Sequence, residues 1–190
     1  MVSYSKGQFL YQDNFIVFTG GPGSGKTAVI DELKARNFFC SEEVGRKIIQ
    51  TQIEGKGDAL PWANKEAFRD LMLKSEIASY QQYQVQSELV FFDRSIIDIL
   101  GYSNLEQIKL SDELVSAISN FKYHLKVFIF PPWKDIFTND SERKQDFTIA
   151  IDTYKEMVLA YESADYELIK VPFGSVNKRV DFILANLKYS

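Results

Sequence analysis

One feature constrains this chain more than any other: the run Gly20-Gly21-Pro22-Gly23-Ser24-Gly25-Lys26-Thr27. It matches the pattern G-x-x-x-x-G-K-[ST] in full, which is the pattern of a phosphate-binding P-loop. The apolar residues 15–18 precede the run, and a stretch with helical periodicity follows it. Because the motif requires a strand before it and a helix after it, this context supports the match. The sequence therefore predicts a site for a nucleoside triphosphate with magnesium.

Each part of this run has a role in the expected site. Glycines allow the backbone to curl so that successive N–H groups face phosphate oxygens. The N-terminus of the following helix adds a partial positive charge. Lys26 is expected to bridge the β- and γ-phosphates, and the Thr27 hydroxyl to bind magnesium. The predicted nucleotide-binding residues are Gly20, Gly21, Pro22, Gly23, Ser24, Gly25, Lys26, Thr27 and Ala28.

Strand-like and helix-like segments alternate along the rest of the chain. We expect strands at residues 15–18, 38–40, 89–92, 125–130 and 166–171, and helices at 26–36, 41–53, 62–84, 111–121, 147–163 and from 176 onward. Ser41 and Ser175 are the predicted N-caps of their helices. This alternation is typical of a parallel sheet with helices on both faces. We predict one three-layer α/β/α domain over residues 1–190, with ligands beyond the carboxyl ends of its strands.

Composition and charge exclude several classes of protein. The net charge of −4 over 190 residues argues against nucleic-acid binding, which needs a concentrated basic surface. Cys40 and His124 are the only cysteine and histidine, which excludes a cysteine-cluster metal site and a Ser-His-Asp triad. The apolar runs are too short to cross a bilayer, and the N-terminus lacks the apolar core of a signal peptide. We therefore expect a cytoplasmic protein without membrane insertion.

A second acidic group is expected near the magnesium, at the end of a neighbouring strand. The run 89–92 ends in Asp93-Arg94-Ser95. Asp93 is predicted to be a magnesium ligand or the base for a substrate hydroxyl; the competing interpretation is a helix N-cap. Motor ATPases usually place a second acid directly beside the first, whereas Arg94 stands here. This favours transfer to a substrate over hydrolysis, and Arg94 is expected to bind phosphate or to hold the acid.

Two further segments are candidates for contacts with the acceptor and the triphosphate. Glu43 and Arg46 share a helix face, where they either grip an acceptor or form a solvated ion pair. Residues 135–146 are the most polar segment and a candidate lid, in which Arg143, and then Lys144, would close over the triphosphate. The alternative for this segment is a charged, solvent-exposed loop.

Aromatic residues and two guanine-type patterns complete the list of candidates. Residues 172–175 follow the last strand, where we expect backbone contacts to an adenine ring, and Trp133 and Phe173 are expected in the core or a hinge. The D-x-x-G pattern of residues 98–101 lies several residues beyond the strand end. The Asn-Lys pattern of residues 64–67 lacks its final aspartate. A GTP-dependent switch protein is therefore not expected.

With these elements in order, residues 15–187 resemble the AAA-domain family of P-loop kinase-like ATPases. This group contains the ribosylnicotinamide kinase domain of the bacterial NAD regulator. The resemblance rests on the P-loop, Glu-Val-Gly-Arg from Glu43, Phe-Phe-Asp-Arg-Ser from Phe91, and Val-Pro-x-x-Ser-Val-x-x-Arg-Val from Val171. It implies a five-stranded parallel sheet of order 2-3-1-4-5, ATP with Mg²⁺, and acceptor contacts from Glu43, Arg46 and Asp93.

Two hypotheses from different classes follow. The first is an ATP-dependent phosphotransferase acting on a small, hydroxyl-bearing, nucleoside-like metabolite, with Lys26, Asp93 and Arg143 as catalytic residues. The alternative is an ATP-binding regulatory or adaptor ATPase with weak hydrolysis and a protein or lipid partner. A polynucleotide 5′-kinase is a third possibility, against which the net charge speaks.

Overall fold

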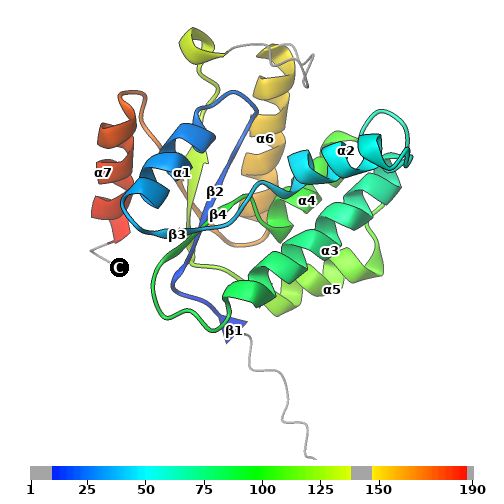
Figure 1. Ribbon diagram of the computed structural model, residues 1–190, viewed down its shortest axis with the longest axis horizontal. Coiled ribbons are helices and arrows are strands. Elements are labelled where there is room, and N and C mark those ends of the chain that lie inside the picture. Colours follow the sequence, from blue (N-terminus) through cyan, green and yellow to red (C-terminus); the bar gives the residue numbers. More distant parts are fainter. Residues whose placement is uncertain (1–9, 138–146, 188–190) are drawn as a thin grey trace, which may run out of the picture.

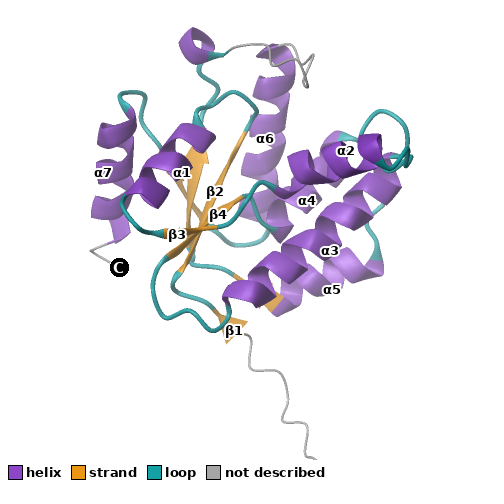
Figure 2. Cartoon of the chain, viewed as in Figure 1, coloured by secondary structure: helices purple, strands orange, loops and turns teal. Residues whose placement is uncertain are grey.

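The computed structural model describes residues 10–137 and 147–187, in which helices and strands alternate (Figures 1 and 2). The main strands are β2 (Phe15–Gly20), β3 (Phe39–Cys40), β4 (Val90–Asp93), β6 (Lys126–Phe130) and β7 (Glu167–Lys170). The helices are α1 (Lys26–Ala35), α2 (Val44–Glu54), α3 (Lys65–Tyr83), α4 (Ile96–Leu105), α5 (Asp112–Asn120), α6 (Phe147–Ser163) and α7 (Val176–Leu187). Shorter elements are β1 (Leu10–Tyr11), β5 (Phe121–Lys122) and the 3-10 turn η1 (Lys134–Ile136).

The five main strands form one parallel sheet in the order β3-β4-β2-β6-β7. Numbered along the chain, this is the predicted order 2-3-1-4-5. Strand β2 lies in the centre, with Phe18 opposite both Asp93 of β4 and Phe128 of β6. The segment after β2 therefore leaves the middle of the sheet at its carboxyl edge. Strands β1 and β5 pair separately as a short parallel sheet.

Strand β2 is buried on both faces, which explains why its sequence is a continuous apolar run. Its alternate residues enter two hydrophobic clusters. Phe15 and Val17 pack with residues of α3, α4, α5 and α6, and Ile16 and Phe18 pack with residues of α1 and α7. Figure 1 shows these two groups of helices on opposite sides of the sheet. The predicted three-layer α/β/α architecture is confirmed.

Helix ends show where local capping outweighs periodicity. Helix α3 begins at Lys65 rather than at Trp62, because the Asn64 side chain accepts a hydrogen bond from the Ala67 N–H at 3.1 Å. Ser175 lies directly before α7 and accepts from the Lys178 N–H at 3.5 Å, as predicted. Among the described residues, no helix has the length and apolar character needed to cross a membrane.

Ser41 does not cap α2, so that prediction is wrong. The helix begins at Val44, because the residue after β3 is still held to β4: the Ser41 N–H donates to the Phe91 carbonyl at 2.8 Å. Its hydroxyl instead accepts from the backbone N–H of Asp93 at 3.0 Å. Ser41 is buried and fixes the carboxyl end of β4.

Helix α4 is absent from the sequence prediction, although a capping box marks its start. The Ser95 side chain accepts from the Ile97 N–H at 3.1 Å, and Asp98 accepts from the Ser95 N–H at 3.0 Å. The Asp98 carboxylate also accepts from the Thr19 hydroxyl at 2.7 Å and the Tyr161 hydroxyl at 2.6 Å. Asp98 is therefore a buried structural carboxylate that joins β2, α4 and α6.

Replacing Asp98 by alanine should destabilise the fold by about 3 kcal/mol, because it leaves the buried hydroxyls of Thr19 and Tyr161 and the partly buried Arg94 guanidinium without their acceptor. Urea unfolding at neutral pH measures this loss. Glu113→Ala, which removes an exposed acid from the first turn of α5, is the control and should cost less than about 1 kcal/mol. Equal losses in the two variants would contradict the structural role of Asp98.

Candidate functional site

The P-loop begins at the carboxyl end of β2 and passes directly into α1. Gly20 has φ 131°, and a Cβ at this position would collide with the carbonyl oxygen of Phe130. The Ser24 hydroxyl donates to the Gly21 carbonyl at 2.9 Å, which ties the loop to itself. Lys26 begins α1 and is 7% exposed. The loop thus combines a helix N-terminus with a buried cation, the arrangement that favours a bound anion.

Asp93 ends β4 beside the P-loop strand and is 5% exposed. Burial raises the pKa of its carboxyl above the usual value, and the nearby Lys26 ammonium opposes that rise. Its Oδ1 is buried and has no hydrogen-bond partner among the described residues. Because Ser95 caps α4, the N-cap interpretation of Asp93 is excluded. A carboxylate oxygen without a donor, beside the P-loop, fits a magnesium ligand.

Arg94 adopts φ 79°, a left-handed conformation that is uncommon for a residue other than glycine. Its guanidinium donates to Asp98 Oδ1 at 3.0 Å, and its Nε lies 3.9 Å from Glu43 Oε1. Burial lowers the pKa of Arg94, but the surrounding carboxylates of Asp98, Glu43 and Asp93 outweigh it and raise the pKa. Arg94 is therefore a charged link between the start of α4 and the start of α2.

Glu43 and Arg46 form the ion pair that their spacing predicts, with Arg46 Nε 3.8 Å from Glu43 Oε2. They do not stand apart from the P-loop. Both line a cavity of about 400 Å³ together with Thr27 and Asp93. The structure therefore brings four of the predicted site residues into one cavity, supplied by α1, α2 and the end of β4.

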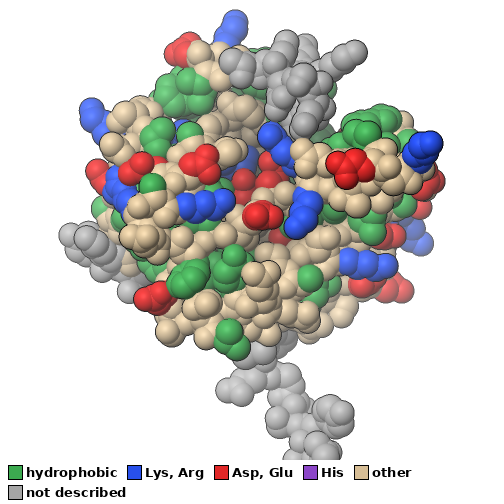
Figure 3. Space-filling model, in the orientation of Figure 1, with side chains coloured by type: hydrophobic (Ala, Val, Ile, Leu, Met, Phe, Trp, Pro, Cys, Tyr) green, Lys and Arg blue, Asp and Glu red, His purple; other side chains and the backbone are tan. Residues whose placement is uncertain are grey.

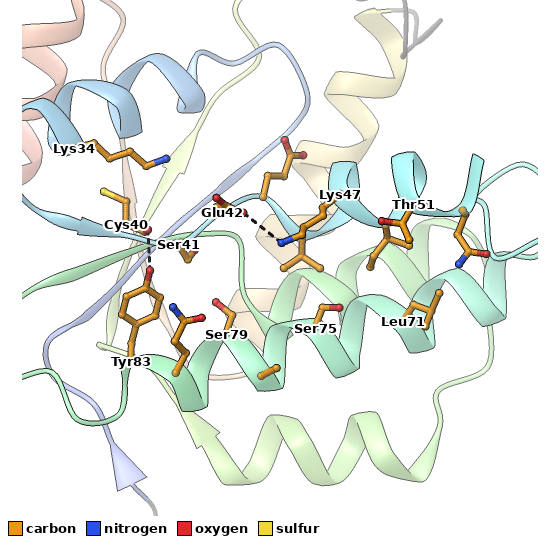
Figure 4. Close-up of a pocket in the computed structure, with 16 residues that line it drawn as sticks. Lys34, Cys40, Ser41, Glu42, Lys47, Thr51, Leu71, Ser75, Ser79 and Tyr83 are labelled. Atoms are coloured by element: carbon orange, nitrogen blue, oxygen red, sulfur yellow. Dashed lines mark hydrogen bonds and ion pairs between the residues drawn. The ribbon is translucent and has the colours of Figure 1, made fainter. Parts of the chain in front are cut away.

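A second cavity, of about 760 Å³, lies between α2 and α3 (Figure 4). Thr51 of α2 and Ser75 and Ser79 of α3 are among the polar residues that line it. Glu42 forms an ion pair with Lys47 at 3.7 Å. Five residues line both cavities: Lys34, Ser41, Glu42, Glu43 and Lys47. The two cavities are therefore adjacent.

Glu76 is an acidic residue that the sequence prediction missed. It lies on α3 between Leu73 and Tyr80, and all three are buried. Burial raises the pKa of its carboxyl well above the ordinary 4.5, and the carboxylates of Asp98 and Asp93 raise it further. The sequence signal that could have identified it is an acidic residue at helical spacing within the apolar stripe of α3.

The raised pKa of Glu76 predicts that stability falls as pH rises above about 4.5. In that range the unfolded chain releases a proton that the folded chain keeps. The free energy of unfolding therefore falls by up to about 1.4 kcal/mol per pH unit. The fall ends once pH passes the folded-state pKa. Glu76→Gln should remove this slope and be more stable than the wild type at pH 8, as measured by urea unfolding from pH 4 to 9. The exposed Glu66→Gln is the control, and equal slopes in the wild type and Glu76→Gln would contradict the prediction.

Trp133 and Phe173 meet beside the site, with ring centroids 4.9 Å apart. Phe173, predicted in the core or in a hinge, is 54% exposed and therefore does not lie in the core. It follows β7 in a loop, where its ring packs against Trp133 at an interplanar angle of 33°. Figure 3 shows basic and acidic side chains interspersed over one face of the molecule rather than gathered into a basic stripe.

Most of the candidate lid cannot be compared with the structure. Arg143 and Lys144 lie outside the described residues. Of the segment 135–146, only residues 135–137 are described. The first two belong to the 3-10 turn η1, and Phe137 caps its C-terminal end. The Phe137 ring packs against Phe147 with centroids 5.3 Å apart and lies beside Gly23 of the P-loop. The lid role of Arg143 stays a prediction.

Comparison with known proteins gives one family and several solved structures. The model of a family described as AAA domain matches residues 15–179, which confirms the resemblance inferred from the sequence. No protein with a curated description matches the chain.

Two solved structures have a fold similar to that of this chain. A deoxyadenosine kinase from M. mycoides, with products dCMP and dCDP bound, matches at a TM-score of 0.65 and 13% identity, over 93% of this chain and 100% of that one. A NadR protein in complex with NR also gives a TM-score of 0.65, at 16% identity, over 93% of this chain. This chain spans about half of that protein, 51%. At these identities the matches establish a shared fold.

Proposed function

The chain belongs to the AAA domain family, and on that basis we propose that it transfers a phosphoryl group from ATP to a hydroxyl of a small, nucleoside-like acceptor. The fold that it shares with a deoxyadenosine kinase supports transfer to a small molecule. The neighbour of Asp93 is Arg94 rather than a second acid, which favours a hydroxyl acceptor over water.

The observation that carries this proposal is the cavity of about 400 Å³ beside the P-loop. A kinase must hold its acceptor next to the γ-phosphate, and pockets for small molecules span roughly 300–1,000 Å³. Thr27 lines this cavity at the start of α1, and Asp93 lines it at the end of β4. Glu43 supplies a carboxylate that accepts hydrogen bonds, and Arg46 a cationic donor, for the polar groups of an acceptor.

We propose the following division of roles among these residues. Lys26 and the N–H groups of the P-loop hold the β- and γ-phosphates, and the Thr27 hydroxyl and Asp93 would hold magnesium. When bound, the metal would neutralise charge on the transferred phosphoryl group. Asp93 or Glu43 takes the proton of the acceptor hydroxyl. Arg94, which lies between Glu43 and Asp98, keeps the Glu43 carboxylate oriented.

The second cavity supports an acceptor with a polar body. Hydroxyl groups of Thr51, Ser75 and Ser79 line it, and five of its lining residues also line the first cavity. A nucleoside-like acceptor with its reacting hydroxyl near Asp93 would have room for its remaining polar groups along α2 and α3.

The exposed ring of Phe173 and the backbone of residues 172–175 are the proposed contacts of the adenine ring of ATP.

The proposal is tested by following ADP release and phosphorylated product with ATP, Mg²⁺ and a panel of nucleosides, ribosylnicotinamide and other small hydroxyl compounds. A compound that both stimulates ADP release and gains a phosphate supports the proposal and identifies the acceptor. Slow ATP hydrolysis that no compound stimulates would favour the regulatory or adaptor ATPase instead.

A further inference from the structure

Arg179, on α7, is a buried arginine that the proposed function leaves without a role. It is 2% exposed, and none of the described carboxylates pairs with its guanidinium. Its acceptors are two P-loop carbonyl oxygens: Nη2 donates to Ser24 at 3.0 Å and Nη1 to Gly25 at 3.4 Å. A buried charge is costly unless hydrogen bonds or an opposite charge compensate for the lost water, and here the two carbonyl groups supply the hydrogen bonds. The contacts of Arg179 therefore point to the P-loop.

Aromatic rings hold the guanidinium in place from the other side. Its central carbon lies 4.8 Å from the centroid of the Phe130 ring and 5.5 Å from that of Trp133. Burial lowers the pKa of Arg179, but an arginine stays protonated at neutral pH. The planar guanidinium, with its N–H donors, is thus held between Phe130 at the carboxyl end of β6 and the P-loop.

The geometry of a trans peptide gives these two contacts a consequence for phosphate binding. In a planar trans peptide the C=O and N–H groups point in opposite directions, and the described backbone contains no cis peptide bond. The Ser24 carbonyl belongs to the same peptide unit as the Gly25 N–H, and the Gly25 carbonyl to that of the Lys26 N–H. When Arg179 holds both carbonyls on one side, both N–H groups face the other side, where a P-loop receives phosphate.

We propose that Arg179 is a positioning residue of the P-loop, which orients the Gly25 and Lys26 N–H groups toward the phosphates and sets the affinity for a triphosphate. This inference rests on the proposed function, because it requires that the P-loop binds nucleoside triphosphate. The left-handed conformation of Gly25, with φ 79°, is the turn that the two carbonyl contacts hold in place. The positive charge also lies behind both peptide units and strengthens their N–H dipoles.

The test compares the binding of inorganic tripolyphosphate and of ATP, each with Mg²⁺, by calorimetry on the full chain. Arg179→Met should weaken both roughly 10- to 100-fold, the loss expected for charge-assisted hydrogen bonds. Arg36→Met is the matched control. Arg36 also joins α1 to α7, through Asp181 at 2.7 Å and Asn177 at 3.2 Å, but has no contact with the P-loop. It should lower thermal stability without changing tripolyphosphate binding.

Arg179→Lys keeps the positive charge and removes the two-pronged donation, so it separates position from charge. It should also bind tripolyphosphate more weakly than the wild type, by less than Arg179→Met, and it stands in if the methionine variant does not fold. Wild-type affinity in both Arg179 variants, or in the lysine variant alone, would overturn the positioning role while leaving the proposed function standing. A wild-type protein that binds neither tripolyphosphate nor ATP would overturn the proposed function and this inference together.

Discussion

Replacing Lys26 by alanine should lower phosphoryl transfer by roughly 10²- to 10³-fold and leave the fold intact. Lys26 is the buried lysine of the P-loop, begins α1, and is close enough to Asp93 to oppose the rise in the pKa of that carboxyl. Its ammonium is the fixed charge that is expected to meet the β- and γ-phosphates. Because phosphoryl transfer relies on positioning and electrostatics, removal of this charge should lower turnover more than it raises KM for the acceptor.

Lys155→Ala serves as the control for this experiment. Lys155 is an exposed lysine of α6 whose ammonium pairs with Asp152 at 3.0 Å, away from the P-loop. Initial rates of product formation and circular dichroism should be measured on both variants. Wild-type turnover in a correctly folded Lys26→Ala protein would reject the proposed mechanism.

The parts of the fold that could be predicted are those that depend on short patterns. Four apolar residues before the P-loop predict β2, and the Val29, Ile30 and Leu33 stripe predicts α1, whose buried residues include all three. The strand order came from the resemblance of the whole chain to a family, because no local pattern states which strands pair. Local apolar patterns and family motifs can both be read directly from a sequence, so these parts of the fold could be predicted without a structure.

The missed features depend on contacts between distant segments. Ser41 is a residue type typical of a helix N-cap, yet its backbone bonds to β4 and its hydroxyl accepts from the backbone N–H of Asp93. Asp98 gains its donors from Thr19 and Tyr161, which lie 79 and 63 residues away. Arg179 reaches carbonyl groups more than 150 residues earlier, 155 in the case of Ser24. Only the folded chain brings such partners together, so their roles could not be derived from spacing.

Replacing Asp93 by asparagine should lower turnover by roughly 10²- to 10⁴-fold, whether the carboxylate binds magnesium or acts as the base. The variant should nonetheless be at least as stable as the wild type at neutral pH, because burial disfavours the charged carboxylate and raises its pKa. Loss of activity with retained stability would separate the chemical role of Asp93 from a structural one. Asp152→Asn, at a half-exposed position of α6, is the control and should change neither property.

A magnesium titration of Asp93→Asn distinguishes the two roles that the sequence left open. If Asp93 binds the metal, the neutral amide oxygen should bind it more weakly, and turnover should recover in part as the magnesium concentration rises. If Asp93 is the base, magnesium should not restore the rate, and the acidic limb of the pH–rate profile should disappear. In that case Glu43, another acid that lines the cavity, would not supply the base. Full activity of Asp93→Asn at every magnesium concentration would show that the unpartnered Oδ1 has no part in the reaction.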